Sequence, residues 1–188
     1  DGMSIQAAID AAAEGDTIVA GPGTYAESVT IDTPGLTIQG LPGAIVNVAM
    51  PAGMATADRT IGFKINANNV EISGMTIAGP LGEYLHYETD FANLGYSYGV
   101  YVENNVTGTV LSDNTITDIR TGMDFHPGNT ATVTGNDIYN TRGAFLVRSD
   151  GVDLSDNTFG AVGNEWDATF LAGTPADYFA DPLADPAA

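Results

Sequence analysis

The sequence contains no cysteine, and only 5 of its 188 residues are lysine or arginine. The absence of cysteine excludes disulfide bonds, thiol catalysis and zinc–thiolate sites. Against the 5 basic residues stand 24 aspartates and glutamates, which gives a formal net charge of −19. A polyanion of this density is repelled by nucleic acid, because binding there depends on lysine and arginine replacing the phosphate counterions. We therefore expect no nucleic-acid partner.

Long apolar runs are missing as well. No stretch of about 18 apolar residues exists, and no basic segment followed by an apolar core opens the chain. We expect neither insertion into a membrane nor an export signal within this sequence. Hydrophobic residues make up 44% of the chain and charged residues only 15%, which predicts a folded protein. An acidic, cysteine-free chain is typical of the outside of the cell, so we expect an extracellular or cell-surface module of a larger protein or assembly.

A short helix is expected first, and strands thereafter. Apolar residues recur at helical spacing between Ser4, the predicted N-cap, and Gly15, the predicted stop. After the helix they alternate with polar residues between glycine- and proline-containing turns, which predicts short strands. The expected organisation of a single domain, 1–188, is a helix cap (1–15), coils (16–160, with an insertion at about 80–96) and a C-terminal cap or tail (161–188).

The strands repeat. Segments that begin at Thr109, Ala131 and Val152 align with one another at steps of 22 and 21 residues. A repeat of this length, built only from strands and turns, is typical of a stacked β-solenoid, in which each coil buries its apolar face against the next.

One column of this alignment is rich in asparagine. Stacked asparagine side chains can hydrogen-bond to each other and to the turn backbone, so we expect the column to be structural. It consists of Met75, Asn114, Asn136 and Asn157.

The beginning of the chain resembles a known family. The segments SIQAAIDAA (4–12), GDTI (15–18), GPGTY (21–25) and LTIQG (36–40) look like the start of the pectin-lyase-like right-handed parallel β-helix superfamily. The resemblance covers roughly residues 1–160 and implies an all-β fold, a right-handed parallel β-helix whose N-terminal end is capped by a short α-helix. It does not choose an activity, because the superfamily holds polysaccharide lyases, polygalacturonases, uronate epimerases, phage tailspikes and non-enzymatic surface proteins.

An outward strip of polar and aromatic side chains is predicted when one strand register is laid on every coil. In the segment 62–66, Phe63 and Ile65 are expected in the core and Lys64 outside. The later coils are aligned by their glycines. The predicted outer columns are Lys64, Tyr101, Asp124 and Phe145, and beside them Asn66, Glu103 and His126, with Val147 and then Arg148 on the last coil.

The connection between Ile77 and Gly99 is about 16 residues longer than its counterparts in the later coils. It carries several aromatic side chains and a histidine, among them Tyr84, His86 and Tyr87. Aromatic rings pack well on the C–H faces of sugars, which predicts one wall of a sugar-binding groove. The sequence is equally consistent with a loop that folds over its own coil and buries these rings.

The segment GMDFHP, 122–127, is the sharpest candidate for catalysis. It places Asp124 and His126 on one strand face, and a histidine beside a carboxylate can transfer protons near neutral pH. The segment is weakly similar to the active-site strand of the mannuronan C5-epimerases, in which glycine, an apolar residue, aspartate, proline and histidine follow in that order. The resemblance implies roles for these two residues only, since Thr121 stands where that family has tyrosine and Val147 where it has aspartate.

The reaction implied is abstraction of the proton α to a uronate carboxyl group, the first step of both epimerisation and β-elimination. It needs a base, an acid and a cation that neutralises the carboxylate. We expect His126 as the base, Tyr101 as the acid, and Lys64, Arg148 or a bound Ca²⁺ as the neutraliser. Asp124, His126 and Tyr101 are thus the candidate catalytic residues, and the candidate substrate-binding residues are Lys64, Glu103, Arg148, Tyr84, His86 and Tyr87. In the other interpretation, Asp124 and His126 form an exposed ion pair on a solvated face.

Calcium is a candidate cofactor because the chain is so acidic. Carboxylates cluster in several coils and in the insertion, yet none has the fixed spacing of a recognised calcium loop, so the ligands stay unknown. Separately, Asn105-Val106-Thr107 matches the acceptor pattern for N-glycosylation, which is common by chance.

Two functions from different classes remain. The first is an extracellular polysaccharide-interacting module that processes polyuronates as an epimerase or lyase. The second is a non-catalytic structural or glycan-binding β-helix of a surface adhesin, filament or secreted protein. The small number of basic residues and a body of about six coils, roughly 25–30 Å long, favour the second. The Asp124 and His126 pair beside the longest insertion favours the first.

Overall fold

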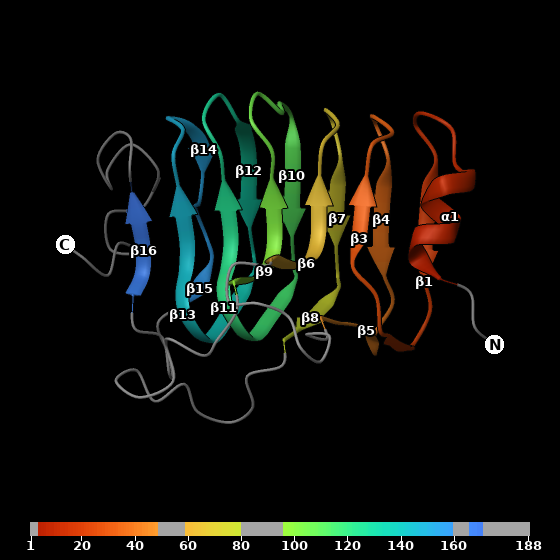
Figure 1. Ribbon diagram of the computed structural model, residues 1–188, viewed down its shortest axis with the longest axis horizontal. Helices are drawn as coiled ribbons and strands as arrows, with labels where there is room; N and C mark the ends of the chain where they lie inside the picture. Colours follow the sequence, from red (N-terminus) through yellow and green to blue (C-terminus); the bar gives the residue numbers. More distant parts are fainter. Residues whose placement is uncertain (1–3, 49–58, 80–95, 160–165, 171–188) are drawn as a thin grey trace.

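The computed structural model describes residues 4–48, 59–79, 96–159 and 166–170. Over these ranges the chain is a right-handed parallel β-helix with a short N-terminal capping helix, as predicted (Figure 1). Helix α1 (Ile5–Ala11) lies at one end of the stack, and the coils follow it in chain order along the long axis. No helix in the described part of the chain is long and apolar enough to span a membrane.

The strands form two sheets in which every pairing is parallel. The first sheet has the spatial order β1 (Thr17–Ala20), β4 (Thr37–Gly40), β7 (Glu71–Ser73), β10 (Thr109–Ser112), β12 (Thr130–Thr134) and β14 (Gly151–Asp153). The second has the order β2 (Gly23–Tyr25), β5 (Ala44–Asn47), β8 (Thr76–Ala78), β11 (Thr115–Phe125), β9 (Tyr96–Val102), β6 (Arg59–Ile65) and β3 (Val29–Ile31), and β13 (Asp137–Val147) pairs with β11, β15 (Thr158–Phe159) and β16 (Trp166–Phe170). Strands β11 and β13 each have 11 residues, long enough to join the two halves of the second sheet.

Helix α1 is fixed to the first coil by polar contacts at its N-terminus. Ser4 is the N-cap, as predicted, and its hydroxyl accepts a hydrogen bond from the Ala7 amide at 3.2 Å. The Glu27 carboxylate accepts from the Ser4 hydroxyl and from the Ile5 amide at 2.7 Å. A carboxylate at this end also interacts favourably with the helix dipole. The helix is therefore held in place by a carboxylate from the segment between β2 and β3 of the first coil.

The helix ends earlier than the sequence predicts. Ala11 is its last residue, and the Ala12 amide bonds to the Ile9 carbonyl in place of a regular helical bond. The predicted stop at Gly15 is therefore wrong. Gly15 has a φ of 84° and lies in the turn that leads into β1, where glycine tolerates the left-handed conformation.

The apolar columns of the stack follow the predicted repeat. Leu111 pairs in register with Ile72 below it and Val133 above it, and all three are fully buried. Because like side chains stack at each coil, the interior is a set of continuous apolar ladders that no single coil could bury alone.

The asparagine column is confirmed as structural. Asn136 Oδ1 accepts hydrogen bonds at 3.0 Å from both the amide and the Nδ2 of Asn114. Asn157 Oδ1 accepts from the same two groups of Asn136, at 3.0 and 2.8 Å. At the lower end, the Met75 amide donates to Asn114 Oδ1 at 3.0 Å. Each side chain thus satisfies the buried turn backbone of the coil before it.

The predicted position of Phe145 on the outer strip is wrong. Phe145 is buried in the core with 1% of its surface exposed, and Leu146 takes the outer place beside Asp124. The sequence alignment matched the glycines of the two coils, whereas the ladder pairs Gly143 with Thr121 and keeps one offset along the whole of β11 and β13. A shift of one residue exchanges the two faces of a strand, which moves Phe145 inside. The predicted outer position of Val147 is wrong for the same reason, since Val147 pairs with Phe125 and is fully buried.

Candidate functional site

The outer strip is formed by two neighbouring columns on β6, β9, β11 and the end of β13. Backbone hydrogen bonds between successive coils hold these side chains in line, as from the His126 amide to the Val102 carbonyl at 3.2 Å. The columns consist of Lys64, Tyr101, Asp124 and Leu146, and of Asn66, Glu103, His126 and Arg148. The structure therefore brings together six predicted site residues. The other three, Tyr84, His86 and Tyr87, lie outside the described residues.

Asp124 is a buried carboxylate held by a cation from the next coil. Its side chain is 1% exposed, and Arg148 Nη1 donates a hydrogen bond to its Oδ1. Its Oδ2 is buried and makes no hydrogen bond with any described residue. Burial raises the pKa of Asp124 above its ordinary value, and the charge and hydrogen bond of Arg148 oppose that shift. Asp124 is not part of a solvated ion pair.

His126 lies between this buried carboxylate and solvent. Its Nε2 is 3.7 Å from Asp124 Oδ2, beyond hydrogen-bond distance, and its side chain is 18% exposed. Burial lowers the pKa of His126, while the charge of Asp124 opposes that shift. The imidazole is consequently neutral near neutral pH, which is the state a general base needs.

Tyr101 forms the floor of the strip beneath His126. The two rings have centroids 4.6 Å apart and are tilted by 50°, and Tyr98 contacts Tyr101 edge-on with centroids 5.3 Å apart. Arg59 Nη1 donates to the Tyr101 hydroxyl at 2.8 Å. Since the phenolic oxygen accepts this bond, its own hydrogen is free to point to another acceptor.

Sequence reasoning missed Arg59, and it counted Tyr98 among the aromatic residues of the insertion, whereas Tyr98 lies in β9 against Tyr101. Arg59 opens β6 three residues before Gly62, where the predicted strand register began, and reaches over the next coil to Tyr101. Its charge could have indicated it, because each basic residue in a chain with only 5 of them is a candidate for a functional role. Burial raises the pKa of Tyr98, with the charge of Asp124 acting in the same direction, so its hydroxyl stays protonated.

Lys64 and Glu103 form an ion pair at the open side of the strip. Lys64 Nζ lies 3.1 Å from Glu103 Oε1, and both side chains are about a third exposed, at 35% and 33%. Partial burial would raise the pKa of Glu103, but the hydrogen bond and charge of Lys64 outweigh it, so this pKa lies below its ordinary value. Lys64 is therefore already neutralised by a protein carboxylate.

The charges of the strip do not cancel. Lys64 faces Glu103 and Arg148 faces Asp124, whereas Arg59 is paired with no carboxylate among the described residues and has only the phenol of Tyr101 as its partner. Asp32, on the preceding coil, accepts a hydrogen bond from Asn66 at 2.7 Å. Counted over β6, β9, β11 and the end of β13 alone, the site has one more cation than carboxylate. Such an excess favours an anionic ligand.

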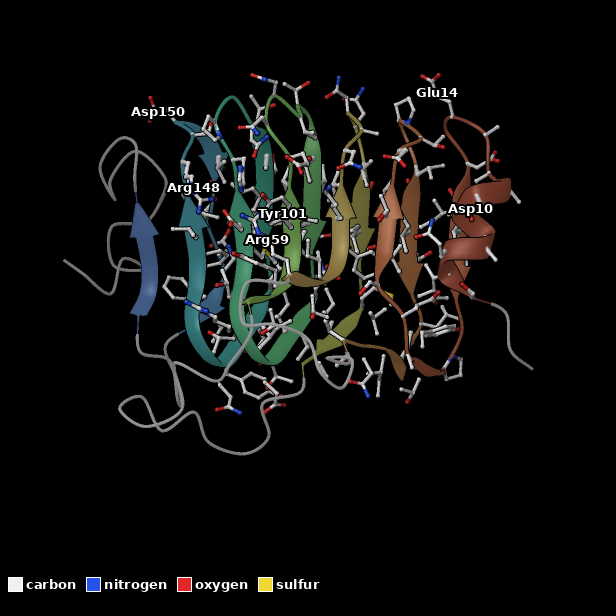
Figure 2. The ribbon with its side chains drawn as sticks, viewed as in Figure 1. Asp10, Glu14, Arg59, Tyr101, Arg148 and Asp150 are labelled. Carbon is white, nitrogen blue, oxygen red and sulfur yellow. The ribbon has the colours of Figure 1, made fainter. Side chains whose placement is uncertain are left out.

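The basic residues of the whole chain are gathered on one sheet. Figure 2 shows Arg59 and Arg148 in the same region as Tyr101, away from Asp10 and Glu14 at the capped end. All five lie within or directly after strands β6, β11 and β13: Arg59, Lys64, Arg120, Arg142 and Arg148. In a chain of net charge −19, the side chains of Arg59, Lys64 and Arg148 mark the face of this sheet that an anion can approach.

No metal site can be assigned. Within the described ranges, no three or more His, Asp or Glu side chains are grouped so that they could hold a metal ion. A groove of about 410 Å³ lies elsewhere, between α1, β1 and β2, and its lining offers no charged side chain. The strip is therefore the place where the described residues concentrate chemistry.

Comparison with known proteins supports the fold. No family model matches the sequence. A cell surface glycoprotein of Methanothermus fervidus is 32% identical over 114 residues, which is 60% of this chain and 15% of that protein. A solved pectin methylesterase mutant in complex with a hexasaccharide has a TM-score of 0.54 and 14% sequence identity, over 94% of this chain and 64% of that one. The chain spans less than two thirds of each.

The structural neighbour supports the fold alone. A pectin-active enzyme with the same coil architecture bears out the resemblance to the pectin-lyase-like parallel β-helix proteins at the level of the fold. The similarity to the mannuronan C5-epimerase strand stays a prediction that rests on Asp124 and His126.

Proposed function

We propose that this chain is a polysaccharide-interacting β-helix module of a cell surface, and that the outer strip binds anionic polysaccharide. The observation that carries the proposal is the concentration of all five basic residues on one sheet of a chain whose net charge is −19. The surface location is supported by the cell surface glycoprotein that the chain resembles. The polysaccharide class is supported by a pectin-active neighbour with the same fold.

The exposed parts of the strip fix how a polymer would lie. Tyr101 and Asp124 are almost fully buried, so most of the surface that a ligand meets belongs to Arg59, His126, Arg148 and the Lys64–Glu103 pair. A uronate carboxylate can exchange with Glu103 for Lys64, or bind the guanidinium groups of Arg59 and Arg148 through paired hydrogen bonds. The strongly acidic remainder of the chain keeps the polymer away from every other face.

A catalytic role is the second candidate, and it is favoured by the neutral His126 beside a buried carboxylate. His126 would take the proton from the carbon α to the uronate carboxyl group, and the electron pair would move into that carboxyl group. A neighbouring guanidinium stabilises the charge that develops there. Return of a proton to the opposite face gives epimerisation, and loss of the β-oxygen substituent gives elimination.

The structure changes the part we assign to Asp124 in this reaction. Because its side chain is 1% exposed and held by Arg148, Asp124 acts on the substrate only through His126, whose imidazole it polarises by its charge across 3.7 Å. Tyr101 keeps the role of acid, with its hydroxyl oriented by Arg59. The non-catalytic function, a glycan-binding or structural module, uses the same cations and needs no proton transfer.

Binding and chemistry are tested separately. Calorimetric titration with polymannuronate and polygalacturonate, and with neutral dextran as control, should show binding of the polyuronates only, weakening as salt is added. Ultraviolet absorbance then detects unsaturated ends and proton NMR detects inverted C5 centres, with and without Ca²⁺. Loss of turnover in His126→Gln, with binding retained, supports catalysis. Binding without turnover supports the non-catalytic module, and a folded protein that binds no polyuronate at low salt overturns the proposal.

A further inference from the structure

One motif of the sequence is not used by the outer strip. Asn105-Val106-Thr107 is the only place in the chain where an asparagine is followed two residues later by serine or threonine with a residue other than proline between them. This is the acceptor pattern for N-linked oligosaccharides. The pattern is common by chance, so it indicates a glycan only where the folded chain leaves the asparagine exposed and its side-chain nitrogen without a structural hydrogen bond.

The fold places the motif on the surface. Asn105 and Thr107 are both exposed, in the turn that connects β9 to β10. Asn105 has a φ of 61°, a left-handed conformation that asparagine adopts readily at turns. Its amide donates to the Pro127 carbonyl of the next coil at 2.9 Å, so the backbone of the turn is held in place.

The side-chain amide of Asn105 has one packed end and one free end. Its Oδ1 lies against the next coil, where a Cβ added at Gly128 would meet it at 2.4 Å. Its Nδ2 donates to no described residue. By contrast, Asn66 Nδ2 donates to Asp32 at 2.7 Å and Asn136 Nδ2 donates to Leu111 at 2.9 Å. A substituent on Asn105 Nδ2 therefore breaks no hydrogen bond of the fold.

We propose that Asn105 carries an N-linked oligosaccharide, an inference that rests on the surface location in the proposed function. The donor is an oligosaccharide joined through its anomeric carbon to a polyprenyl phosphate or diphosphate. A bond forms between Nδ2 and the anomeric carbon, the bond from that carbon to the phosphate oxygen breaks, and the electron pair leaves with the lipid phosphate. The proton lost from Nδ2 goes to a base of the transferase.

The timing of this step follows from the burial of Val106. Val106 is 3% exposed and belongs to the core. Once the coil is closed, a transferase therefore cannot pull residues 105–107 into an extended conformation in its active site. Modification then precedes closure of the coil. The folded turn needs only to leave room for the glycan, and Asn105 leaves it, since the residue is exposed and its Nδ2 donates to no described residue.

The attached glycan would stand at one end of the outer strip. Asn105 follows Glu103 by two residues, and Gly128, against which it packs, follows His126 by two. A bulky, hydrated sugar there would border the proposed polysaccharide site without covering Arg59, which lies at the far end of β6.

Secretion from a host that N-glycosylates tests the inference. Intact mass and peptide mapping should find one oligosaccharide on the wild-type chain, on Thr107→Ser and on the neighbouring control Asn104→Gln. It should be missing from Asn105→Gln and from Thr107→Ala. Circular dichroism checks that each variant is folded.

The outcomes separate this inference from the proposed function. A folded, secreted wild-type chain without glycan, from cells that modify a reference glycoprotein, overturns the inference, as does a glycan that persists in Asn105→Gln. Polyuronate binding is measured on the same preparations and on unglycosylated protein. Loss of binding in both, with the glycan present at Asn105, overturns the proposed function alone.

Discussion

Arg148 Nη1 donates a hydrogen bond to Oδ1 of Asp124, a carboxylate that is 1% exposed and lies one coil earlier. The pair joins β11 to the end of β13 at the centre of the strip. Removing the cation leaves a buried negative charge without a partner, which is far more costly than losing an exposed pair.

Arg148→Met should therefore lower the free energy of unfolding by about 3 kcal/mol. Lys64→Met, which frees the partly exposed Glu103, should cost less than about 1 kcal/mol. Combining Arg148→Met with Asp124→Asn should cost less than the two changes added together, because the uncompensated charge is gone. Urea denaturation of the four variants measures these differences. An Arg148→Met as mild as Lys64→Met would contradict the pairing.

The stability of the chain should depend on His126 in a defined direction. Burial lowers the pKa of His126 in the folded state, so the folded chain binds fewer protons there than the unfolded chain. The stabilising contribution is present above the unfolded pKa of about 6.5 and is lost as the pH falls through the lower folded value. His126→Gln should remove this loss, so the difference in unfolding free energy between wild type and variant shrinks on acidification.

Asp124 titrates beside His126 with the opposite sign. Its pKa is raised in the folded state, so its contribution is greatest at low pH and is lost as the pH rises through the raised value. The comparison of wild type with His126→Gln should thus be repeated in the Asp124→Asn background, by urea denaturation between about pH 7 and about pH 5. Parallel stability curves in both backgrounds would show that His126 is not perturbed.

Asn136 should be among the most sensitive positions of the coil. Its Oδ1 accepts from the buried Asn114 amide, and its Nδ2 donates to the Leu111 carbonyl. Asn136→Ala leaves both groups buried and unsatisfied, at about 1–3 kcal/mol each. The exposed Asn104→Ala is the matched control, with an expected change within about 0.5 kcal/mol. Equal midpoints of urea unfolding in the two variants would rule out an energetic role for the asparagine column.

Arg59 should matter for binding more than for stability. It is exposed and has no carboxylate among its described contacts, so Arg59→Met should change the unfolding free energy by less than about 1 kcal/mol. Loss of the unbalanced cation should weaken polyuronate binding by about tenfold, which corresponds to about 1.4 kcal/mol. Arg59→Lys keeps the charge and should recover part of it. Calorimetric titration at low salt checks both, and unchanged affinity in Arg59→Met would remove Arg59 from the site.

Periodicity made the fold predictable. The columns through Leu111 and Asn136 could be predicted from the sequence because stacking places chemically alike residues at one interval, and the coils that follow Leu111 contain no insertion. The strip was predictable to the same extent: Lys64, Tyr101 and Asp124 follow from strand alternation once one coil is placed.

The error at Phe145 arose because the coils were aligned by their glycines and not by the constant spacing between paired strands. Gly143 stands one position earlier in its coil than Gly122, so matching the two glycines put Phe145 on the wrong face. The sequence separation between Thr115 and its partner Asp137 gives the correct register for the whole strand pair. Arg59 was missed for another reason. A long side chain that reaches from one strand to the next coil leaves no periodic trace in the sequence.

The contacts of Glu27 with α1 also determine when the end of the stack can close. A helix of 7 residues is too short to be stable in isolation, and the carboxylate that holds its first turn comes 22 residues after Ile5 in the chain. Gln6 adds a second tie, since its side chain bonds to the backbone of Thr30. The residues of α1 must therefore wait, without a stable helix, until β3 has been synthesised, and the helical cap is completed only after the coil it covers.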